Sequence, residues 1–302
     1  MASFTKQIKD EVTKIETNKL ESIAEVNGFL LLNTNNYEDR ITIYIENNSV
    51  ARRIFSLLKR IYNININLTI RTQKRFNVKT IYILEIKEKV DFILKDINDM
   101  KKHILEYSDE ERASFLKGCF LSNGSINDPS KSKYHLEIFS KDEEIAKIIN
   151  EVLHSFDLSS KIIKREKEYM IYIKAAEEIS DFIKLMGAVE SLFYYEDIRI
   201  YRDHKNMVNR LNNCEQANVE KSMKTCHEQI ENINYLKDND LVSLLDDKIK
   251  LVMEYRLKYP ETTLQELANI ISMETEYNIT KSGINHHFRK IKDLVNKARD
   301  KE

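Results

Sequence analysis

Apolar and polar positions follow two periodicities in the first 190 residues of the chain, in an order that occurs twice. Apolar residues alternate with polar ones, which predicts strands, over 41–45, 64–71, 80–86, 134–139, 161–165 and 169–174. They recur at helical spacing over 50–62, 90–98, 142–155 and 176–186. An apolar segment with a central glycine, Gly28 or Gly118, precedes each series. The pattern predicts a duplicated α+β domain over 1–190, with repeats of about 1–100 and 101–190 and an antiparallel sheet.

Beyond Gly187 the pattern predicts helices only. Residues 195–237 contain no Gly or Pro and are expected to form two helices, within a helical linker over 191–240. The remainder, 241–302, is expected to be a compact all-α domain. Its one proline, Pro260, falls between two predicted helices, where a residue without a backbone N–H ends a helix.

Composition limits the classes of function. The chain has 302 residues with 48 basic and 49 acidic side chains, so any affinity for nucleic acid must come from local clusters of charge. Cys119, Cys214 and Cys226 are odd in number and lack a CxxC pair, which indicates reduced thiols. The N-terminus has no apolar signal core, and no window approaches about eighteen apolar residues. We therefore expect a cytoplasmic protein without a membrane partner.

The segment FLKGCFLSNGSI at 115–126 resembles the LAGLIDADG helix of homing endonucleases. In that family two such helices pack together at small residues, and the acid before the last glycine of each holds the metal that cleaves DNA. Here that position is Asn123, and a weaker copy at 26–34 has Asn33 there, with Asn27 as a further polar residue. A neutral amide is a poor ligand for Mg²⁺ beside a carboxylate, although Asp128 lies near enough in sequence to replace one ligand. We therefore predict no catalytic residue, no metal and no cofactor.

Residues 123–124 also allow a second interpretation. Asn and Gly both tolerate left-handed backbone, so Asn123-Gly124 is typical of a helix C-terminus as well.

A helix-turn-helix pattern occupies the C-terminal segment. A short helix opens over 263–268 with Thr262 or Thr263 as its cap, and a second helix begins at 280–281. On the second helix Ile284, Phe288 and Ile291 share one face, which we expect to be buried. From 281 to 299 six Lys or Arg stand against Asp293 alone. Such a helix is typical of one that enters the major groove of DNA.

The predicted DNA-binding residues are polar or basic and lie on that helix and on the linker. They are Lys281, Ser282, Asn285, His286, Arg289, Lys290, Lys292 and Lys297, with Arg202, Lys205 and Arg210 on the linker. Asn285 is suited to pair with adenine, and Arg289 with guanine or a phosphate. A solvated basic helix without a ligand is the structural alternative. His286 and His287 are adjacent, so they point to different helix faces and are not expected to share a metal.

Taken together these segments resemble the WhiA family of bacterial regulators, which combine a degenerate LAGLIDADG domain with a helix-turn-helix. The matching residues are 112–120, 124–129, 134–137, 186–188, 202–206, 209–210, 213–215, 217–218 and 281–286. The resemblance implies sequence-specific binding of double-stranded DNA without cleavage. It also implies control of sporulation genes in actinobacteria, or of cell division and chromosome segregation in other Gram-positive bacteria. His287 departs from the family, in which we expect an Arg.

The Ile-, Asn- and Lys-rich composition is typical of an AT-rich genome and favours the cell-division role. A second regulator or an RNA polymerase component is a further candidate partner, and the expected location is the nucleoid. The alternative functions are a LAGLIDADG-type DNA endonuclease, which Asn33 and Asn123 oppose, and an RNA maturase. The maturase hypothesis does not explain why the chain has a C-terminal helix-turn-helix.

Overall fold

The computed structural model describes residues 3–33, 35–37, 39–73 and 79–300, and the chain divides into two compact units, residues 1–203 and 204–302. The first unit contains two copies of one α+β arrangement, and the second contains helices only. The fold class expected from the sequence, a duplicated LAGLIDADG-like domain followed by an all-α helix-turn-helix domain, is therefore confirmed.

The first repeat begins with a short helix that the sequence pattern did not predict, α1 (Phe4–Val12). The elements that follow it are α2 (Lys19–Leu32), β1 (Asn35–Tyr37), β2 (Arg40–Ile45), α3 (Asn48–Tyr62), β3 (Ile66–Gln73), β4 (Lys79–Ile86), α4 (Val90–His103) and the short 3-10 helix η1 (Ile104–Glu106). The strands form an antiparallel sheet in the order β1-β2-β4-β3. Ile43 pairs with Leu84 in its centre, and both side chains are fully buried.

The second repeat has the same order of elements as the first has from α2 to α4. They are α5 (Asp109–Asn123), β5 (Gly124–Ile126), β6 (Leu136–Ser140), α6 (Glu143–His154), β7 (Lys161–Arg165), β8 (Glu168–Ile173) and α7 (Ala176–Leu185). Its sheet has the matching order β5-β6-β8-β7, so the domain holds two sheets where the sequence pattern suggested one. The alternation in β6 and β8 directs Leu136, Ile138 and Ile171 into the core, where apolar burial stabilises the domain.

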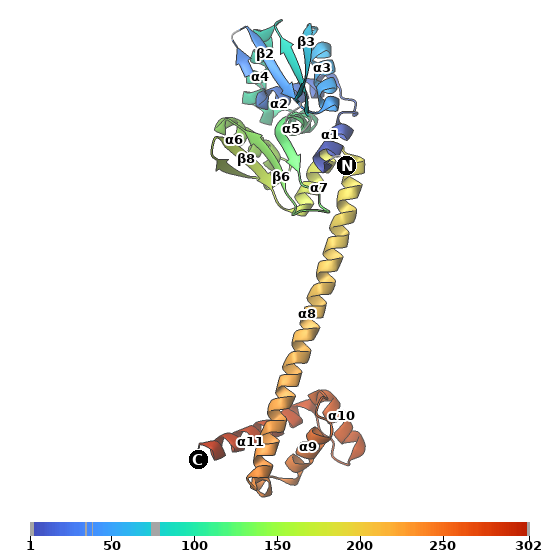
Figure 1. The fold of residues 1–302 in the computed structure, drawn as a ribbon, viewed down its shortest axis with the longest axis vertical. Coiled ribbons are helices and arrows are strands. Elements are labelled where there is room, and N and C mark those ends of the chain that lie inside the picture. The colour runs from blue at the N-terminus through green and yellow to red at the C-terminus, as the bar shows by residue number, and fades with distance from the viewer. Residues whose placement is uncertain (1–2, 34, 38, 74–78, 301–302) are drawn as a thin grey trace. The chain divides into compact units, whose positions relative to one another are not determined.

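Helices α2 and α5 form the junction between the repeats, and Figure 1 shows the two sheets on either side of them. Both begin with a capping box, Asn18 with Glu21 and Ser108 with Glu111, which satisfies the first backbone N–H groups. Gly28 and Gly118 lie where the helices cross. A Cβ atom on Gly28 would be 2.2 Å from the carbonyl oxygen of Phe115, so the backbones pack in direct contact. Two helices packed at small residues were predicted from the motif, and this packing is confirmed.

One helix, α8 (Val189–Asp238), occupies the segment for which the sequence predicted two helices. The prediction of a break was wrong because the segment contains no Gly or Pro that would end a helix. The boundary between the two units falls inside α8, after Asp203.

The second unit contains the last part of α8, then η2 (Leu241–Leu244), α9 (Asp247–Lys258), α10 (Leu264–Glu274) and α11 (Lys281–Arg299). Pro260 lies between α9 and α10, as predicted. Ile233 and Leu236 on α8 are fully buried in the core of this unit, together with residues of the last three helices. The end of the predicted linker therefore helps to build the helical core.

Candidate nucleic-acid interface

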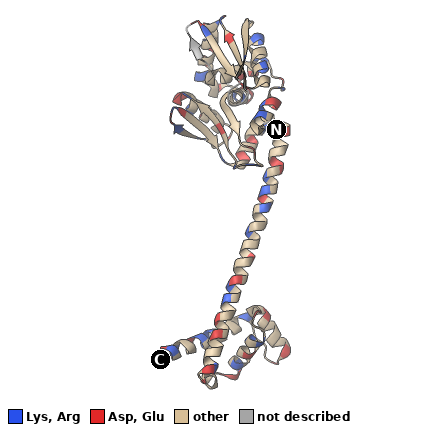
Figure 2. Ribbon diagram, viewed as in Figure 1, with Lys and Arg blue, Asp and Glu red and all other residues tan. Residues whose placement is uncertain are grey.

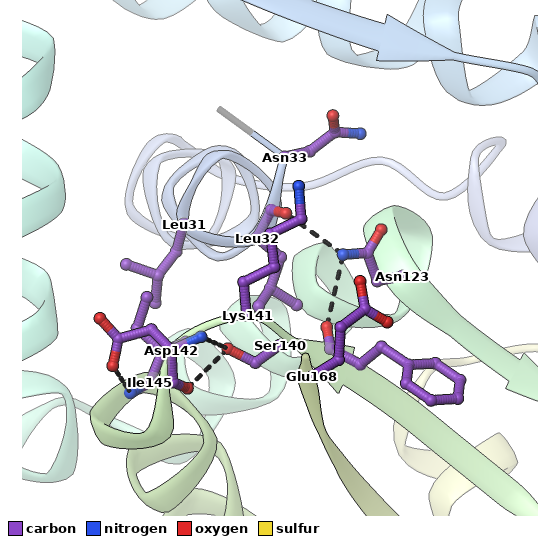
Figure 3. Close-up of a pocket in the computed structure, with 10 residues that line it drawn as sticks. Leu31, Leu32, Asn33, Asn123, Ser140, Lys141, Asp142, Ile145 and Glu168 are labelled. Atoms are coloured by element: carbon purple, nitrogen blue, oxygen red, sulfur yellow. Dashed lines mark hydrogen bonds between the residues drawn. The ribbon is translucent and has the colours of Figure 1, made fainter. Parts of the chain in front are cut away.

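The C-terminal ends of the two motif helices meet at a pocket of about 430 Å³, lined by both Asn33 and Asn123 (Figure 3). Asn123 is the last residue of α5, and the chain continues directly into β5 with Gly124 in extended conformation. The second interpretation of residues 123–124 is therefore right that the helix ends there but wrong about a left-handed turn. A short strand pairs at once with β6 and keeps the backbone extended.

Asn123 uses its amide nitrogen to bind two backbone carbonyl groups. Nδ2 donates to the oxygen of Leu32, on the other motif helix, at 3.2 Å and to that of Phe139 at 3.3 Å. Asn33 donates in the same way to the carbonyl oxygen of Tyr44, at 3.1 Å. A carbonyl oxygen can only accept, so these contacts fix which end of each amide faces inward. The amide of Asn123 thus occupies the backbone oxygens that a cation would otherwise share with a carboxylate.

The donor set of this pocket does not suit a divalent metal. Its two carboxylates are Asp142 and Glu168, but Asp142 caps α6 by accepting from the N–H of Glu144 at 2.7 Å. Lys141 also lines the pocket and adds a positive charge. In the described part of the chain no group of three or more His, Cys, Asp or Glu side chains converges as metal ligands. The residues present therefore do not fit the cation of a LAGLIDADG nuclease.

Asp128, the acid considered as a substitute ligand, does not line this pocket. Its carboxylate accepts from the backbone N–H and the hydroxyl of Ser130, at 2.9 and 2.7 Å, and from the hydroxyl of Tyr194 at 3.2 Å. These bonds hold the loop between β5 and β6. Although burial raises the pKa of Asp128, hydrogen bonds from Ser130, Lys131 and Tyr194 outweigh it and leave the pKa below its ordinary value.

Helices α10 and α11 form the helix-turn-helix that the sequence predicted. Thr263 caps α10 in a capping box with Glu266, and Thr280 caps α11 by accepting from the N–H of Gly283 at 3.3 Å. Ile284, Phe288 and Ile291 are buried, as their spacing predicted. They anchor one face of α11 on α9 and α10, and the opposite face is exposed.

The exposed face of α11 carries the polar residues chosen from the sequence. Ser282, Asn285, His286, Arg289 and Lys290 are all exposed, as expected from the helical period. Figure 2 shows Lys and Arg along α11, with few acidic residues between them. From 281 to 299 the basic side chains outnumber the acidic ones by five, although the net charge of the chain is −1. This arrangement can donate hydrogen bonds to base edges and attract phosphates at the same time.

Some predicted DNA-binding residues already have partners within their own unit. Lys292 forms an ion pair with Glu228 of α8, with Nζ 2.5 Å from Oε1. Arg202 donates to the carbonyl oxygen of Ser132 at 2.9 Å, and its guanidinium lies 5.3 Å from the ring centre of Tyr134. Lys205 and Arg210 are exposed on α8. Contact of these four residues with DNA, like that of the other predicted residues, stays a prediction.

His287 points toward the interior side of α11. Its Nε2 lies 3.4 Å from the hydroxyl of Tyr277, and its Nδ1 is buried without a hydrogen-bond partner among the described residues. Burial lowers the pKa of His287, and His286, Lys290 and Lys248 lower it further. The ring thus favours its neutral form, in contrast to the permanent cation of an arginine.

Arg256 on α9 is a functional candidate of this unit that the pattern analysis passed over. Its side chain is fully buried. The signal was present, because Arg256 follows Ile249, Val252 and Met253 at helical spacing and so stands where an apolar residue is expected. A cation buried at such a position calls for a counter-charge.

No helix in the described part of the chain is long and apolar enough to cross a membrane.

Three family models match successive parts of the chain. They are the WhiA N-terminal LAGLIDADG-like domain at residues 16–98, the WhiA LAGLIDADG-like domain at 112–205 and the WhiA C-terminal HTH domain at 208–295. The resemblance inferred from the sequence is therefore confirmed.

Curated relatives and solved structures agree with these models. Staphylococcus aureus strains JH9 and Newman each have a protein named "Probable cell division protein WhiA" that is 36% identical to this chain, over 99% of the chain and 98% of the relative. The crystal structure of full-length WhiA from Thermatoga maritima has a TM-score of 0.58 at 24% identity, over 98% of this chain and 99% of that one. The N-terminal LAGLIDADG domain of WhiA has a TM-score of 0.52 at 25% identity, over 62% and 94%.

Proposed function

This chain belongs to the WhiA family, and we propose that it is a sequence-specific DNA-binding regulator that does not cleave DNA. The observation that carries the proposal is the exposed face of α11, where Asn285 and Arg289 stand between flanking lysines on a helix anchored by Ile284 and Phe288. A helix of this kind reads base edges in the major groove, while its flanking cations bind phosphates.

The absence of cleavage is proposed from the chemistry of the Asn33 and Asn123 amides. Both direct nitrogen toward carbonyl oxygens, so neither offers an anionic ligand. Phosphodiester cleavage by this fold would need a cation held between the attacking and leaving oxygens. The endonuclease alternative therefore loses its chemical basis, and nothing observed favours a maturase.

We further propose that the regulated genes concern cell division or chromosome segregation more than sporulation. The support is that the two staphylococcal relatives are named as probable cell division proteins, together with the AT-rich character of the composition. A chromosomal target would place the protein on the nucleoid in the cytoplasm. Contacts with a second regulator or an RNA polymerase component stay predictions. Chromatin immunoprecipitation should give discrete peaks upstream of division or segregation genes, whereas even coverage of the chromosome would oppose the proposal.

The test of base reading compares two variants of α11. Asn285→Ala should lower affinity for the preferred site by about 1–3 kcal/mol and leave non-specific binding almost unchanged. Lys297→Ala should weaken both kinds of binding and reduce the salt dependence by roughly one unit of slope. Competition binding at several salt concentrations measures both quantities. If the two variants behave alike, α11 does not read the sequence.

A further inference from the structure

A pocket of about 450 Å³ lies in the second unit where α8 and the loop after α9 meet the start of α10. Three cations, Lys221, Arg256 and Lys281, are among its described lining residues. None of the described lining residues is acidic. The chain as a whole has 49 acids against 48 bases, so a lining of this composition is a local concentration of positive charge. Lys221 and Lys281 are exposed at the rim, and Arg256 is buried.

Arg256 makes too few contacts for a buried cation. Nη1 donates to the carbonyl oxygens of Thr262 at 2.7 Å and Tyr259 at 3.3 Å. Its Nε and Nη2 have no hydrogen-bond partner among the described residues, and no carboxylate pairs with it there. The guanidinium stays charged at any physiological pH, and leaving such a charge buried without a counter-charge is costly. An anion in the pocket would supply the missing counter-charge.

Two further features of the pocket are suited to an anion. The first-turn residues Leu264 and Gln265 of α10 line it, and backbone N–H groups at a helix start attract negative charge. Gln229 is 8% exposed, lines the same pocket and has an Oε1 atom without a partner. Rotation of its amide by half a turn presents Nε2 as a donor instead. Glu266, which belongs to the cap of α10, does not line the pocket.

We propose that this pocket binds a phosphate group and that a phosphodiester of bound DNA supplies it. The inference rests on the proposed function, because Lys281 is the first residue of the helix assigned to base reading. Three cations and the start of a helix recognise the tetrahedral phosphate oxygens and not a base, so the pocket fixes the position of α11 on the duplex. Arg256 also lies 5.6 Å from the ring centre of Phe288, which links the pocket to the buried face of α11.

The experiment replaces single phosphates by neutral methylphosphonates. The duplex is the one that the full chain selects most tightly from a random library. Replacement of the phosphate that occupies the pocket should weaken binding of the wild-type chain roughly fivefold to tenfold at 0.1 M salt. With Lys221→Gln the same replacement should have an effect below about twofold, because the contact is already lost. The matched control is Lys237→Gln, an exposed lysine on the same helix outside the pocket, which should retain the full effect.

A second variant tests the buried arginine. Arg256→Lys keeps a cation but loses the planar pair of donors. Replacement of that phosphate should therefore weaken binding of this variant far less than it weakens binding of the wild-type chain. Circular dichroism shows whether this variant folds, and Lys221→Gln, at an exposed position, keeps the test open if it does not.

The outcomes separate the pocket from the proposed function. Equal effects of every methylphosphonate in wild type and Lys221→Gln would overturn the pocket, while a specific loss in Asn285→Ala would still support base reading. If Asn285→Ala also binds as wild type does, the proposed function fails as well. Inorganic phosphate is titrated into the full chain by calorimetry as a separate arm. Binding that is lost in Lys221→Gln, without any methylphosphonate coupling, would assign the pocket to a free phosphate and overturn DNA as its source.

Discussion

Gly118 on α5 faces the backbone of Glu25 on α2 so closely that a Cβ atom on Gly118 would lie 2.0 Å from the carbonyl oxygen of Glu25. Gly28 makes the reciprocal approach to Phe115. Each glycine thus allows the other helix to pack at backbone distance. The nuclease motif has lost its acids, but the residues that bring the two helices together are in place.

Gly118→Ala should therefore destabilise the first unit. The added methyl group meets backbone atoms, which cannot rotate away, so the helices must separate, and we expect a loss of about 3 kcal/mol or more in the free energy of unfolding. Chemical unfolding followed by circular dichroism measures it. Gly283→Ala is the control, because there the Cβ would meet only side-chain atoms, of Ile279 at 3.1 Å and of Thr280 at 3.7 Å. Equal stability of Gly118→Ala and wild type would contradict the described crossing.

Asn123→Asp should also destabilise the protein, by about 1–3 kcal/mol at neutral pH, since a carboxylate would face the carbonyl oxygens of Leu32 and Phe139 without a proton to share. Adding Asn33→Asp should create measurable affinity for Mg²⁺ or Mn²⁺, because a cation can bridge the acids and these carbonyls. Thermal unfolding with and without the ion tests this. An unchanged midpoint in the double variant would argue against the pocket geometry.

Wild-type protein should leave plasmid and duplex DNA uncut in Mg²⁺ or Mn²⁺, because both motif positions present an amide nitrogen. Gel electrophoresis after prolonged incubation measures cutting. Nicking that co-purifies with the protein and disappears in Glu168→Gln would show that the remaining carboxylates of the pocket suffice.

Glu25→Gln should cost about 3–5 kcal/mol of stability. Glu25 is fully buried and forms two hydrogen bonds of 2.7 Å with Arg53, so the substitution leaves a buried guanidinium without its counter-charge. Lys117, which is buried nearby with a lowered pKa, loses a favourable charge as well. Denaturant unfolding provides the measurement. Glu143→Gln, in an exposed pair with Lys147, is the control and should change stability far less.

His287 should make the second unit less stable in mild acid. Because folding lowers the pKa of His287, the unfolded chain takes up its proton at higher pH than the folded one does. The stability that the neutral ring provides is complete above the ordinary pKa of about 6.5 and is lost as pH falls through that value toward the folded pKa. His287→Gln should therefore lose less stability than wild type between pH 7.5 and 5.5. Equal losses would show that the ring titrates as it does in the unfolded chain.

The periodic elements could be predicted from the sequence because their signal is local. Strand β7 and the buried positions Ile284 and Phe288 were placed correctly by alternation or helical spacing. Strands β1 and β5 were missed, since three residues are too few to show a period. The amide contacts of Asn123 depend on carbonyl groups far apart in the chain, which no local pattern could bring together. Asp128 was misplaced for the same reason, because its partner Tyr194 comes from α8.

The direct passage from α5 into β5 affects the chemical ageing of the protein. An asparagine followed by glycine deamidates when the glycine nitrogen attacks the side-chain carbonyl carbon; ammonia leaves, and hydrolysis of the cyclic imide gives aspartate or isoaspartate. In the folded chain the nitrogen of Gly124 donates to the carbonyl oxygen of Phe120, and two carbonyl groups hold the amide of Asn123, so this attack is disfavoured. In the unfolded chain neither restraint exists. Protein stored unfolded will therefore accumulate a carboxylate at the position where the nucleases of this fold have theirs.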